Sequence, residues 1–369
     1  MRIQEIISKL RERYPLGYQE SYDHSGLQIG DPEQECSGVM LSVETTQAVL
    51  QECREKGCNL LLCHHPILFK PLHRVGTETY QERCVAMAIR YNIVVYALHT
   101  NADNHLTHGI NRYIADKIGI KPQSRRPLVP LEGTEYKLQV MVPEDYAAAV
   151  RRAMHSAGAG TQGNYSQCSF SFGGEGRFTP KQGANPFIGQ QEKPETTREV
   201  CISILCPEHL LGATLSAMRA AHPYEEPAYE VIPLKSRSAQ FGSGLIGELS
   251  EPRSAKQLLR ELKTAFNTPV IAHSRLSNPR EILTRVALCG GAGESMLPEA
   301  WRQGAQMFIT GEAKYNRFLD TAGRTLLVTI GHHPGETVIR ELLSDALAEL
   351  CPSITPIIAQ TDADPISYL

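Results

Sequence analysis

The sequence predicts an α/β protein in which a two-part α/β domain with a mostly parallel sheet is interrupted by an inserted α+β domain. Three observations carry this prediction. Apolar strands alternate with helices near both ends of the 369-residue chain, as in parallel sheets that are buried on both faces. A run of elements in a different order, β-α-β-β-α-β, lies between these two parts. The length also exceeds what one hydrophobic core usually serves.

The first part, residues 1–125, begins with apolar residues at helical spacing, Ile3, Ile6, Ile7 and Leu10, which predict an amphipathic helix. Short apolar runs and longer periodic segments then alternate. The predicted strands are 38–43, 59–63 and 93–98, and the predicted helices are 46–57, 79–92 and 109–119.

The inserted domain, residues 130–234, follows a proline-rich joint at 121–130. Its β-α-β-β-α-β order is that of the ferredoxin-like unit, built from two split βαβ pairs. We expect strands at 135–142, 165–172, 199–206 and 228–234, helices at 144–158 and 208–221, and a long glycine-rich loop at 173–197.

The α/β pattern resumes in the last part, residues 240–369. We expect strands at 242–249, 286–289, 307–310 and 325–330, and helices at 255–266, 294–304 and 336–350. Since an insertion is tolerated where its two ends lie close together in the host domain, the first and last parts are predicted to form one domain.

Composition excludes several classes of function. The net charge is −3 and no long basic block occurs, so no nucleic-acid partner is expected. No apolar stretch approaches the roughly 20 residues that cross a bilayer, and the amino terminus lacks a signal-peptide core. We therefore expect a cytoplasmic protein without a membrane partner. The ten cysteines contain no C-x-x-C pair and are interpreted as buried small hydrophobes.

Two His-His-Pro triplets are the most informative local feature. His64, His65 and Pro66 follow the predicted strand 59–63, and a second triplet, residues 332–334, follows the strand 325–330. With 13 His and 23 Pro in the chain, chance gives such a triplet only about 0.03 times. One triplet alone would be a polar cap on a strand, so a binding site requires other ligand-type residues nearby.

Such residues follow three of the predicted strands, at the ends where ligands collect in parallel sheets. They are His64 and His65 after the first strand, His99 and Asp103 after the second, and His332 and Glu336 after the third. Imidazoles and carboxylates without a thiolate suit Zn²⁺, Fe²⁺ or Mn²⁺. The sequence therefore predicts a metal site.

The pattern further favours two metal ions. Adjacent histidines point in different directions, so His64 and His65 suit two neighbouring ions better than one. If a helix starts at Pro334, a favoured first position, His332 and Glu336 can reach the same point. Two ions about 3.5 to 4 Å apart form a common hydrolytic centre.

Five motifs in fixed order identify a family resemblance: the first HHP, HTNADN (99–104), CGGAGES (289–295), TGEAKYNRF (310–318) and GHHPGE (331–336). With them the chain resembles the NIF-three-like family, some members of which are labelled type-2 GTP cyclohydrolase I homologues. The resemblance covers nearly the whole chain. It includes an insert similar to PII and CutA proteins, with GNYSQCSFSFGGEGRFTP (163–180) and HPYEEPAYE (222–230) its most characteristic stretches.

The resemblance implies two divalent metal ions per subunit, with His99 as a nearby ligand or a neighbour of the ligands. It also implies a ring-shaped homohexamer whose metal sites face an internal cavity, with the inserts covering its openings. The chain departs from the family pattern at Glu312 and Asn316, where Asp and His are frequent, and in YDHSGL (22–27), where WDNVGL is frequent. The ligands implied are His64, His65, Asp103, His332 and Glu336.

Two functions compete, and a third interpretation is that the histidines serve only folding. The first is a metal-dependent hydrolase that acts on a nucleotide-like or phosphorylated small molecule, with His99 as the proton shuttle because histidine titrates near working pH. The second is a non-catalytic metal-binding or regulatory hexamer, used for metal storage, delivery or ligand sensing through the insert. Two stretches stay open: CGGAG is either a phosphate-binding nest or a tight turn, and HPYEEPAYE is either a subunit contact or a second site.

Overall fold

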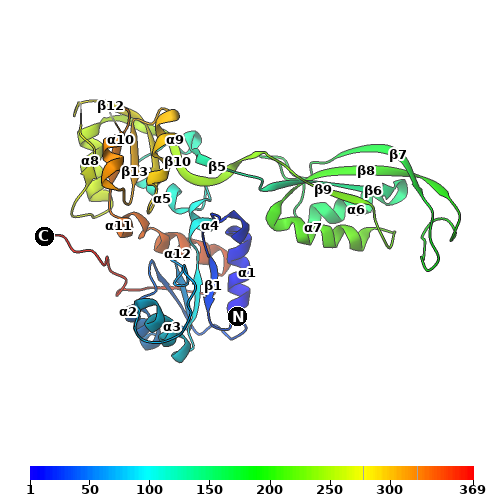
Figure 1. Ribbon diagram of the computed structural model, residues 1–369, viewed down its shortest axis with the longest axis horizontal. Coiled ribbons are helices and arrows are strands. Elements are labelled where there is room, and N and C mark those ends of the chain that lie inside the picture. Colours follow the sequence, from blue (N-terminus) through cyan, green and yellow to red (C-terminus); the bar gives the residue numbers. More distant parts are fainter. Residues whose placement is uncertain (277, 322) are drawn as a thin grey trace. The chain divides into compact units, whose positions relative to one another are not determined.

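A computed structural model describes residues 1–276, 278–321 and 323–369 of the chain. The chain divides into two compact units. Unit 1 combines residues 1–131 with residues 239–369, and unit 2 is the continuous segment 132–238. Unit 1 is thus built from both ends of the chain, as the blue and the orange elements show in Figure 1.

The first sheet of unit 1 has five strands. Its three central strands are parallel, and every residue in them is buried, because these short Val- and Leu-rich runs have helices on both faces. In order across the sheet the strands are β1 (Gly26–Ile29), β4 (Val94–Ala97), β3 (Leu60–Cys63), β2 (Val39–Ser42) and β15 (Ile357–Ile358). The edge strand β1 is antiparallel to β4, and the edge strand β15 is parallel to β2.

The second sheet of unit 1 has six strands. In order they are β11 (Ala272–His273), β14 (Leu326–Thr329), β13 (Met307–Thr310), β12 (Ile282–Cys289), β10 (Arg237–Ser254) and β5 (Arg126–Glu132). Strands β12, β13 and β14 are parallel, whereas β10 is antiparallel to β12 and β11 is antiparallel to β14. Each half of unit 1 thus forms most of one sheet and adds one edge strand to the other, β15 to the first sheet and β5 to the second. Both sheets are mixed with a parallel centre.

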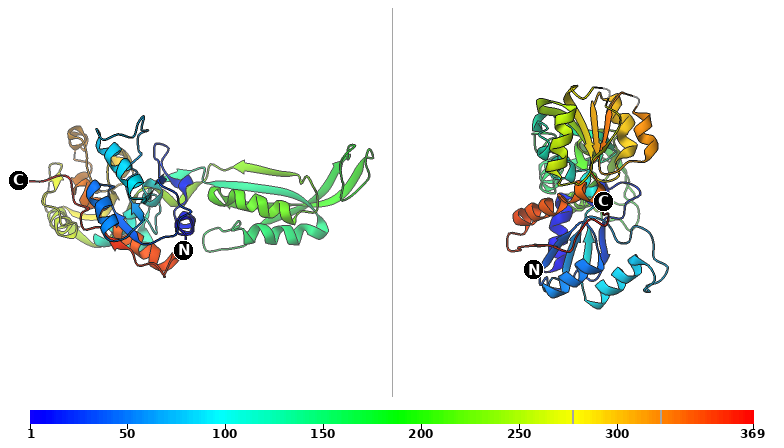
Figure 2. Two further views of the ribbon diagram at one scale, coloured as in Figure 1. Left: turned by 90° about the horizontal axis from the view of Figure 1, so that it is seen from below. Right: turned by 90° about the vertical axis from the view of Figure 1, so that its left-hand side faces the viewer.

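One hydrophobic core joins the two sheets. Leu41 of β2 and Val286 of β12 belong to the same buried cluster, and four helices pack into it: α1 (Ile3–Arg13), α5 (Ile110–Lys117), α8 (Ala255–Ala265) and α12 (Ile339–Leu350). The opposite face of the first sheet packs against α2 (Gln47–Glu55) and α3 (Tyr80–Arg90). The opposite face of the second sheet packs against α9 (Leu297–Arg302) and α10 (Tyr315–Asp320). Figure 2 shows both sheets with their helices.

Unit 2 is a four-stranded antiparallel sheet with two helices on one face (Figure 1). In chain order its elements are β6 (Glu135–Pro143), α6 (Ala147–Ser156), β7 (Phe170–Phe178), β8 (Glu195–Pro207), α7 (Glu208–Ala221) and β9 (Tyr229–Pro233). This is the β-α-β-β-α-β order of the split βαβ unit, and the strands lie in the order β7-β8-β6-β9.

Four predicted segments differ from the structure. The expected loop 173–197 is shorter than predicted, because β7 continues through its glycines to Phe178 and β8 begins at Glu195. The expected strand at 165–172 begins only at Phe170. The joint 121–130 contributes the edge strand β5, where prolines are tolerated because no further strand needs their N–H groups. The expected helix 336–350 is divided into α11 (His332–Glu336) and α12.

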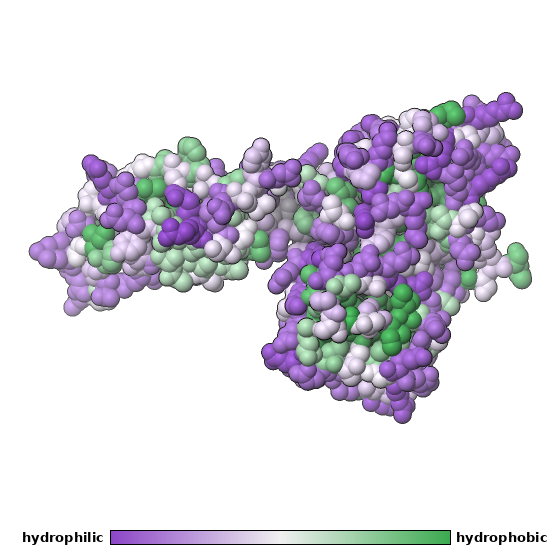
Figure 3. Space-filling model, turned by 180° about the vertical axis from the view of Figure 1, so that it is seen from behind, coloured by the Kyte–Doolittle hydropathy of each residue, from purple (hydrophilic) through white to green (hydrophobic). Residues whose placement is uncertain are grey.

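Shorter elements complete the chain. The helix α4 (Thr100–Asp103) follows β4, and single 3₁₀ turns lie at Leu16–Tyr18, Pro122–Ser124, Glu144–Tyr146 and Glu294–Met296. In the part of the chain that is described, no helix is long and apolar enough to span a membrane. On the face drawn in Figure 3, hydrophobic side chains lie in separate patches among hydrophilic ones.

A buried carboxylate fixes the carboxyl-terminal strand. Both oxygens of Glu52 in α2 accept hydrogen bonds, from the backbone N–H groups of Gln360 and Thr361 at 3.0 to 3.1 Å and from the Thr361 hydroxyl at 2.7 Å. Burial by itself raises the pKa of Glu52, but these hydrogen bonds outweigh it and the pKa is lowered.

We expect Glu52→Ala to lower the free energy of unfolding at pH 7 by about 1 to 3 kcal/mol, because three donors lose their buried acceptor. Since the pKa of Glu52 is lower in the folded state, its contribution is complete above about pH 4.3 and disappears as the pH falls through the folded-state value. Urea unfolding at pH 7 and pH 3 measures this, with the exposed Glu55→Ala as control. An equal loss at both pH values contradicts the assignment.

Candidate metal centre

The ends of three strands meet at a cavity of about 840 Å³ in unit 1. His64 and His65 directly follow β3, and His99 follows the neighbouring parallel strand β4. Asp103 is the last residue of α4, and the short helix α11 after β14 supplies the remaining two predicted ligands, His332 and Glu336. Five of the six predicted residues line the cavity, and the sixth, His64, is fully buried against them.

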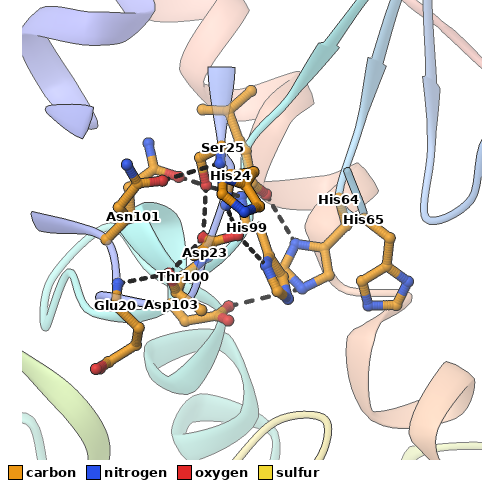
Figure 4. A network of polar contacts seen from close by, with 12 residues as sticks. Glu20, Asp23, His24, Ser25, His64, His65, His99, Thr100, Asn101 and Asp103 are labelled. Atoms are coloured by element: carbon orange, nitrogen blue, oxygen red, sulfur yellow. Dashed lines mark hydrogen bonds and ion pairs between the residues drawn. The ribbon is translucent and has the colours of Figure 1, made fainter. Parts of the chain in front are cut away.

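Three of the histidines are oriented by fixed acceptors. The Nδ1 atom of His64 lies 2.8 Å from the Leu98 carbonyl, that of His65 lies 2.7 Å from Glu44 Oε1, and that of His99 lies 2.7 Å from Asp23 Oδ1. A neutral imidazole that donates through Nδ1 has its lone pair on Nε2. Figure 4 shows the three rings side by side, and their centroids are 4.8 to 5.4 Å apart.

The Nε2 atoms of His64, His65 and His332 face carboxylate oxygens. His64 Nε2 lies 3.6 Å from Glu336 Oε1 and 3.8 Å from Asp103 Oδ1. The second oxygen of Glu336 lies 3.0 Å from His65 Nε2 and 3.1 Å from His332 Nε2.

Three of these atoms, His64 Nε2, Asp103 Oδ1 and Glu336 Oε2, are buried without a hydrogen bond of good geometry to any described residue. Buried acceptors that face one another are costly unless a cation lies between them. The donor set therefore fits a metal ion.

The ligand atoms fall into two groups of three. His64, His65 and His99 form one group, and His65, His332 and Glu336 form the other, with the ligand atoms of each group within 4.8 Å of one another. Both groups contain His65, so the two are adjacent. A cluster of imidazoles and a carboxylate that is able to hold a metal ion is thus present at the predicted place.

The charges of the cluster are strongly coupled. Burial raises the pKa of Glu336, but His64, His332 and His65 outweigh it and hold this pKa well below its usual range. Burial and the neighbouring charge of Glu336 raise the pKa of Asp103. Although burial lowers the pKa of His65, hydrogen bonds with Glu336 and Glu44 raise it to about 10. The negative charge of Glu336 and Glu44 thus stabilises a positive charge within the cluster.

Asp23 is a site residue that sequence reasoning missed. Its carboxylate is buried behind His99 and accepts hydrogen bonds from His24 N at 2.7 Å, Ser25 Oγ at 2.7 Å and Thr100 N at 3.0 Å (Figure 4). Burial raises the pKa of Asp23, but the bond to His99 and these donors outweigh it and lower the pKa strongly. The carboxylate is ionised and fixes the tautomer of His99.

Glu44 and Asp362 were also missed. Glu44 lies just after β2, so the reasoning from strand ends could have found it, whereas Asp362 lies far away in the sequence. Asp362 accepts hydrogen bonds from Val43 N at 2.7 Å and Glu44 N at 3.2 Å, and thereby positions the partner of His65. His333 is the second histidine of its triplet. Its Nε2 atom lies 3.9 Å from Asp362 Oδ1, and it belongs to neither ligand group.

Of the positions that depart from the family pattern, Glu312 reaches the site. Its Oε1 lies 3.5 Å from His332 Nδ1, although most of the side chain is exposed. Asn316 is exposed on α10. The Glu312 carboxylate therefore stands beside a candidate ligand on the solvent side.

The glycine-rich turn after β12 makes room for Glu336. Gly291 has a φ of 61°, and a Cβ atom there would overlap Glu336 Oε1. The amides on either side of it, Gly290 N and Gly293 N, already donate to Asn111 Oδ1 and Thr310 Oγ1. These two N–H groups are therefore used within the turn, which leaves space for the carboxylate of Glu336.

We expect Gly291→Ala to lower the affinity for Zn²⁺ at least tenfold, because the added methyl group displaces Glu336. Gly57→Ala is the matched control: its φ is 72°, but nothing lies within 4 Å of its added Cβ. Both variants should lose about 1 to 2 kcal/mol of stability through backbone strain. Competition with a chromophoric chelator measures the affinity, and equal affinities of the two variants refute this role of Gly291.

Comparison with known proteins gives one family. The model of the Duf34/NIF3 (NGG1p interacting factor 3) family matches residues 1–365. A GTP cyclohydrolase 1 type 2 homolog of Halalkalibacterium halodurans is 34% identical over 349 residues, which is 94% of this chain and 92% of that protein. The homolog in Bacillus subtilis is 30% identical over 371 residues and covers 99% and 98%. The crystal structure of a Bacillus cereus protein related to NIF3 superposes with a TM-score of 0.87 at 30% identity, covering 100% and 99%.

Proposed function

The chain belongs to the Duf34/NIF3 family, and from this premise we propose that it is a metal-dependent hydrolase with two divalent ions per subunit. The proposed substrate is a nucleotide-like or phosphorylated small molecule. One observation carries the proposal: His64 Nε2, Asp103 Oδ1 and Glu336 Oε2 lie buried in one cluster without a hydrogen bond of good geometry to any described residue.

The distances suggest how the ligands are shared. Oε1 of Glu336 is the oxygen near His64, and Oε2 is the oxygen near His65 and His332. The residues that would hold two ions are His64 and Asp103 near Oε1 of Glu336, and His65 and His332 near Oε2. Asp103 lies outside both groups of three and is included because its Oδ1 lies 3.8 Å from His64 Nε2. Zn²⁺, Fe²⁺ and Mn²⁺ all suit this donor set. When bound, two such ions polarise the bond that is attacked and acidify water near neutral pH.

His99 is assigned as the group that moves a proton. It lines the cavity, and its Nδ1 is held by Asp23 at 2.7 Å, so Nε2 is the nitrogen available to a substrate. When Nε2 takes a proton, the adjacent Asp23 carboxylate stabilises the resulting imidazolium.

The charge of the cavity restricts its substrates. Arg302, the one Lys or Arg among the described residues that line it, pairs with Glu299. Two divalent ions and Arg302 balance the five lining carboxylates of Glu20, Glu44, Asp103, Glu299 and Glu336. One phosphoryl group can bind to the ions, but no further lining cation is left for a triphosphate. We therefore propose substrates of low charge, such as phosphomonoesters.

The experiment loads the purified protein with each metal and screens it against nucleotides and phosphoesters, beside a His64→Ala, Glu336→Ala double variant. We expect turnover by the metal-loaded protein alone, with GMP a better substrate than GTP. Turnover that persists in the double variant refutes a metal-dependent hydrolase. A preference for GTP refutes the charge argument while leaving the metal chemistry in place.

The second candidate is a non-catalytic metal-binding assembly that senses a ligand through unit 2. It is favoured by a separate cavity of about 510 Å³ whose lining residues all lie in unit 2. We also propose a homohexamer, as the family resemblance implies, and light scattering of the purified protein tests it. Two bound metal ions without turnover on any class of substrate favour this candidate.

A further inference from the structure

Unit 2 contains a cavity whose floor is the face of the sheet opposite α6 and α7. Val140, Val142 and Ile202 pack into the core beneath the helices. Side chains alternate along a strand, so the intervening Met141 and Cys201 face the other way and line the cavity. Both strongly patterned stretches of the insert, 163–180 and 222–230, contribute residues to it.

The glycines of β7 hollow out this floor. Gly174 and Gly176 lie between Phe172 and Phe178 on the same face of the strand. A Cβ atom on Gly176 would lie 2.5 Å from the carboxyl carbon of Glu199, the β8 residue opposite Gly174. Because Gly176 has no side chain, the carboxylate of Glu199 has room in the middle of an apolar floor.

Tyr224 holds this carboxylate in place. Its hydroxyl donates to Glu199 Oε1 at 2.9 Å, and burial together with this bond raises the pKa of Tyr224, so the phenol stays protonated. The backbone N–H of Tyr224 donates to His222 Nδ1 at 3.0 Å, and His222 Nε2 lies 2.9 Å from the Met141 carbonyl. These hydrogen bonds hold residues 222–224 against the sheet.

Aromatic rings surround the carboxylate. The centroid of Tyr224 lies 6.0 Å from that of Phe178 and 6.3 Å from that of Phe187. Phe187 and Phe172 are each about half exposed, at 51% and 50%. Exposed rings that gather around a hollow mark a binding surface.

The charge of the cavity is negative. Four lining carboxylates, those of Glu175, Glu199, Glu225 and Glu226, face a single lining Lys or Arg, which is Arg177. Arg177 lies 3.1 Å from Glu175 and is therefore already paired. Aromatic faces together with unbalanced carboxylates are the chemistry that recognises ammonium groups, and the volume of about 510 Å³ suits a small molecule.

We propose that this cavity binds an organic cation, a small molecule that carries a methylated ammonium group on an apolar body. Glu199 neutralises its charge, and Phe178, Phe187 and Tyr224 surround its methyl groups. Every lining residue belongs to residues 132–238, so the site is independent of the metal centre. Glu336→Gln should accordingly leave its affinity unchanged.

The test compares choline with 3,3-dimethyl-1-butanol, which has the same shape but carries carbon in place of the charged nitrogen. Both are titrated into the full-length protein and followed by NMR. We expect choline to bind at least about fivefold more tightly than the neutral molecule. Equal binding of the two, or no binding of choline up to about 20 mM, overturns the proposal.

Two pairs of variants locate the site. Gly176→Ala displaces Glu199 and should weaken choline binding at least fivefold, whereas Gly173→Ala on the same strand meets nothing within 4 Å and should not. Glu199→Gln removes the charge, and Glu208→Gln in α7 changes the net charge equally but lies outside the cavity. Unchanged binding in Gly176→Ala and Glu199→Gln overturns the proposal.

Discussion

Glu336→Gln should lower the affinity for Zn²⁺ by at least about 100-fold, more than the loss of a residue that only orients a ligand. The substitution keeps the shape of the side chain but replaces one oxygen with an NH₂ group. Because Oε1 faces His64 and Oε2 faces His65 and His332, either orientation of the amide removes the Glu336 ligand atom of one ion. The effect should therefore be the loss of tight binding of at least one of the two ions.

Competition against a chromophoric chelator measures this affinity. Glu341→Gln serves as the control, since Glu341 is exposed on α12 and pairs with Lys117 at 3.5 Å. The folded state of Glu336→Gln should persist, because an amide can donate to acceptors that a carboxylate can only face. Wild-type affinity in a folded Glu336→Gln protein contradicts the ligand assignment.

Asp23→Asn should lower kcat at least about 100-fold while the metal content stays unchanged. The amide can present its NH₂ group to His99 Nδ1, which moves the imidazole proton to Nε2 and removes the lone pair that accepts the substrate's proton. The remaining amide oxygen can still accept from Ser25 and Thr100, whereas His24 N loses its acceptor, which is the oxygen that faces His99.

The tautomer of His99 gives a readout that does not depend on a known substrate. Nitrogen-15 NMR of the imidazole should report a proton on Nδ1 in the wild type and on Nε2 in Asp23→Asn. Ser25→Ala removes one donor to the carboxylate but leaves the charge, and should keep the wild-type tautomer. An unchanged tautomer and kcat in Asp23→Asn contradict the role given to Asp23.

The metal-ligand candidates could be found from the sequence because local patterns predict where parallel strands end. Buried apolar runs predicted β3, β4 and β14, and the polar residues after them lie at one cavity. The residues that orient these candidates could not be found in this way. Asp23 reaches His99 across 76 positions, and Asp362 reaches Val43 across 319, so their roles appear only in three dimensions.

The differences in the fold have similar physical causes. The glycines of β7 resemble a loop in sequence, yet the strand forms because β8 supplies partners along its whole length. The prolines of β5 resemble a linker, yet an edge position tolerates them. The predicted helix 336–350 is divided into α11 and α12. Both His332 and Glu336 lie in the short helix α11, where His332 Nε2 is 3.1 Å from Glu336 Oε2.

The central claim is that the cluster binds two divalent ions, and the most direct test is the metal stoichiometry of the protein after dialysis against Zn²⁺ or Mn²⁺. Elemental analysis should give two ions per chain in the wild type and in His333→Ala, because His333 lies outside both ligand groups. It should give no more than one ion in His64→Ala and in His332→Ala. One ion or fewer in the wild type, or two in either of these last variants, contradicts the account.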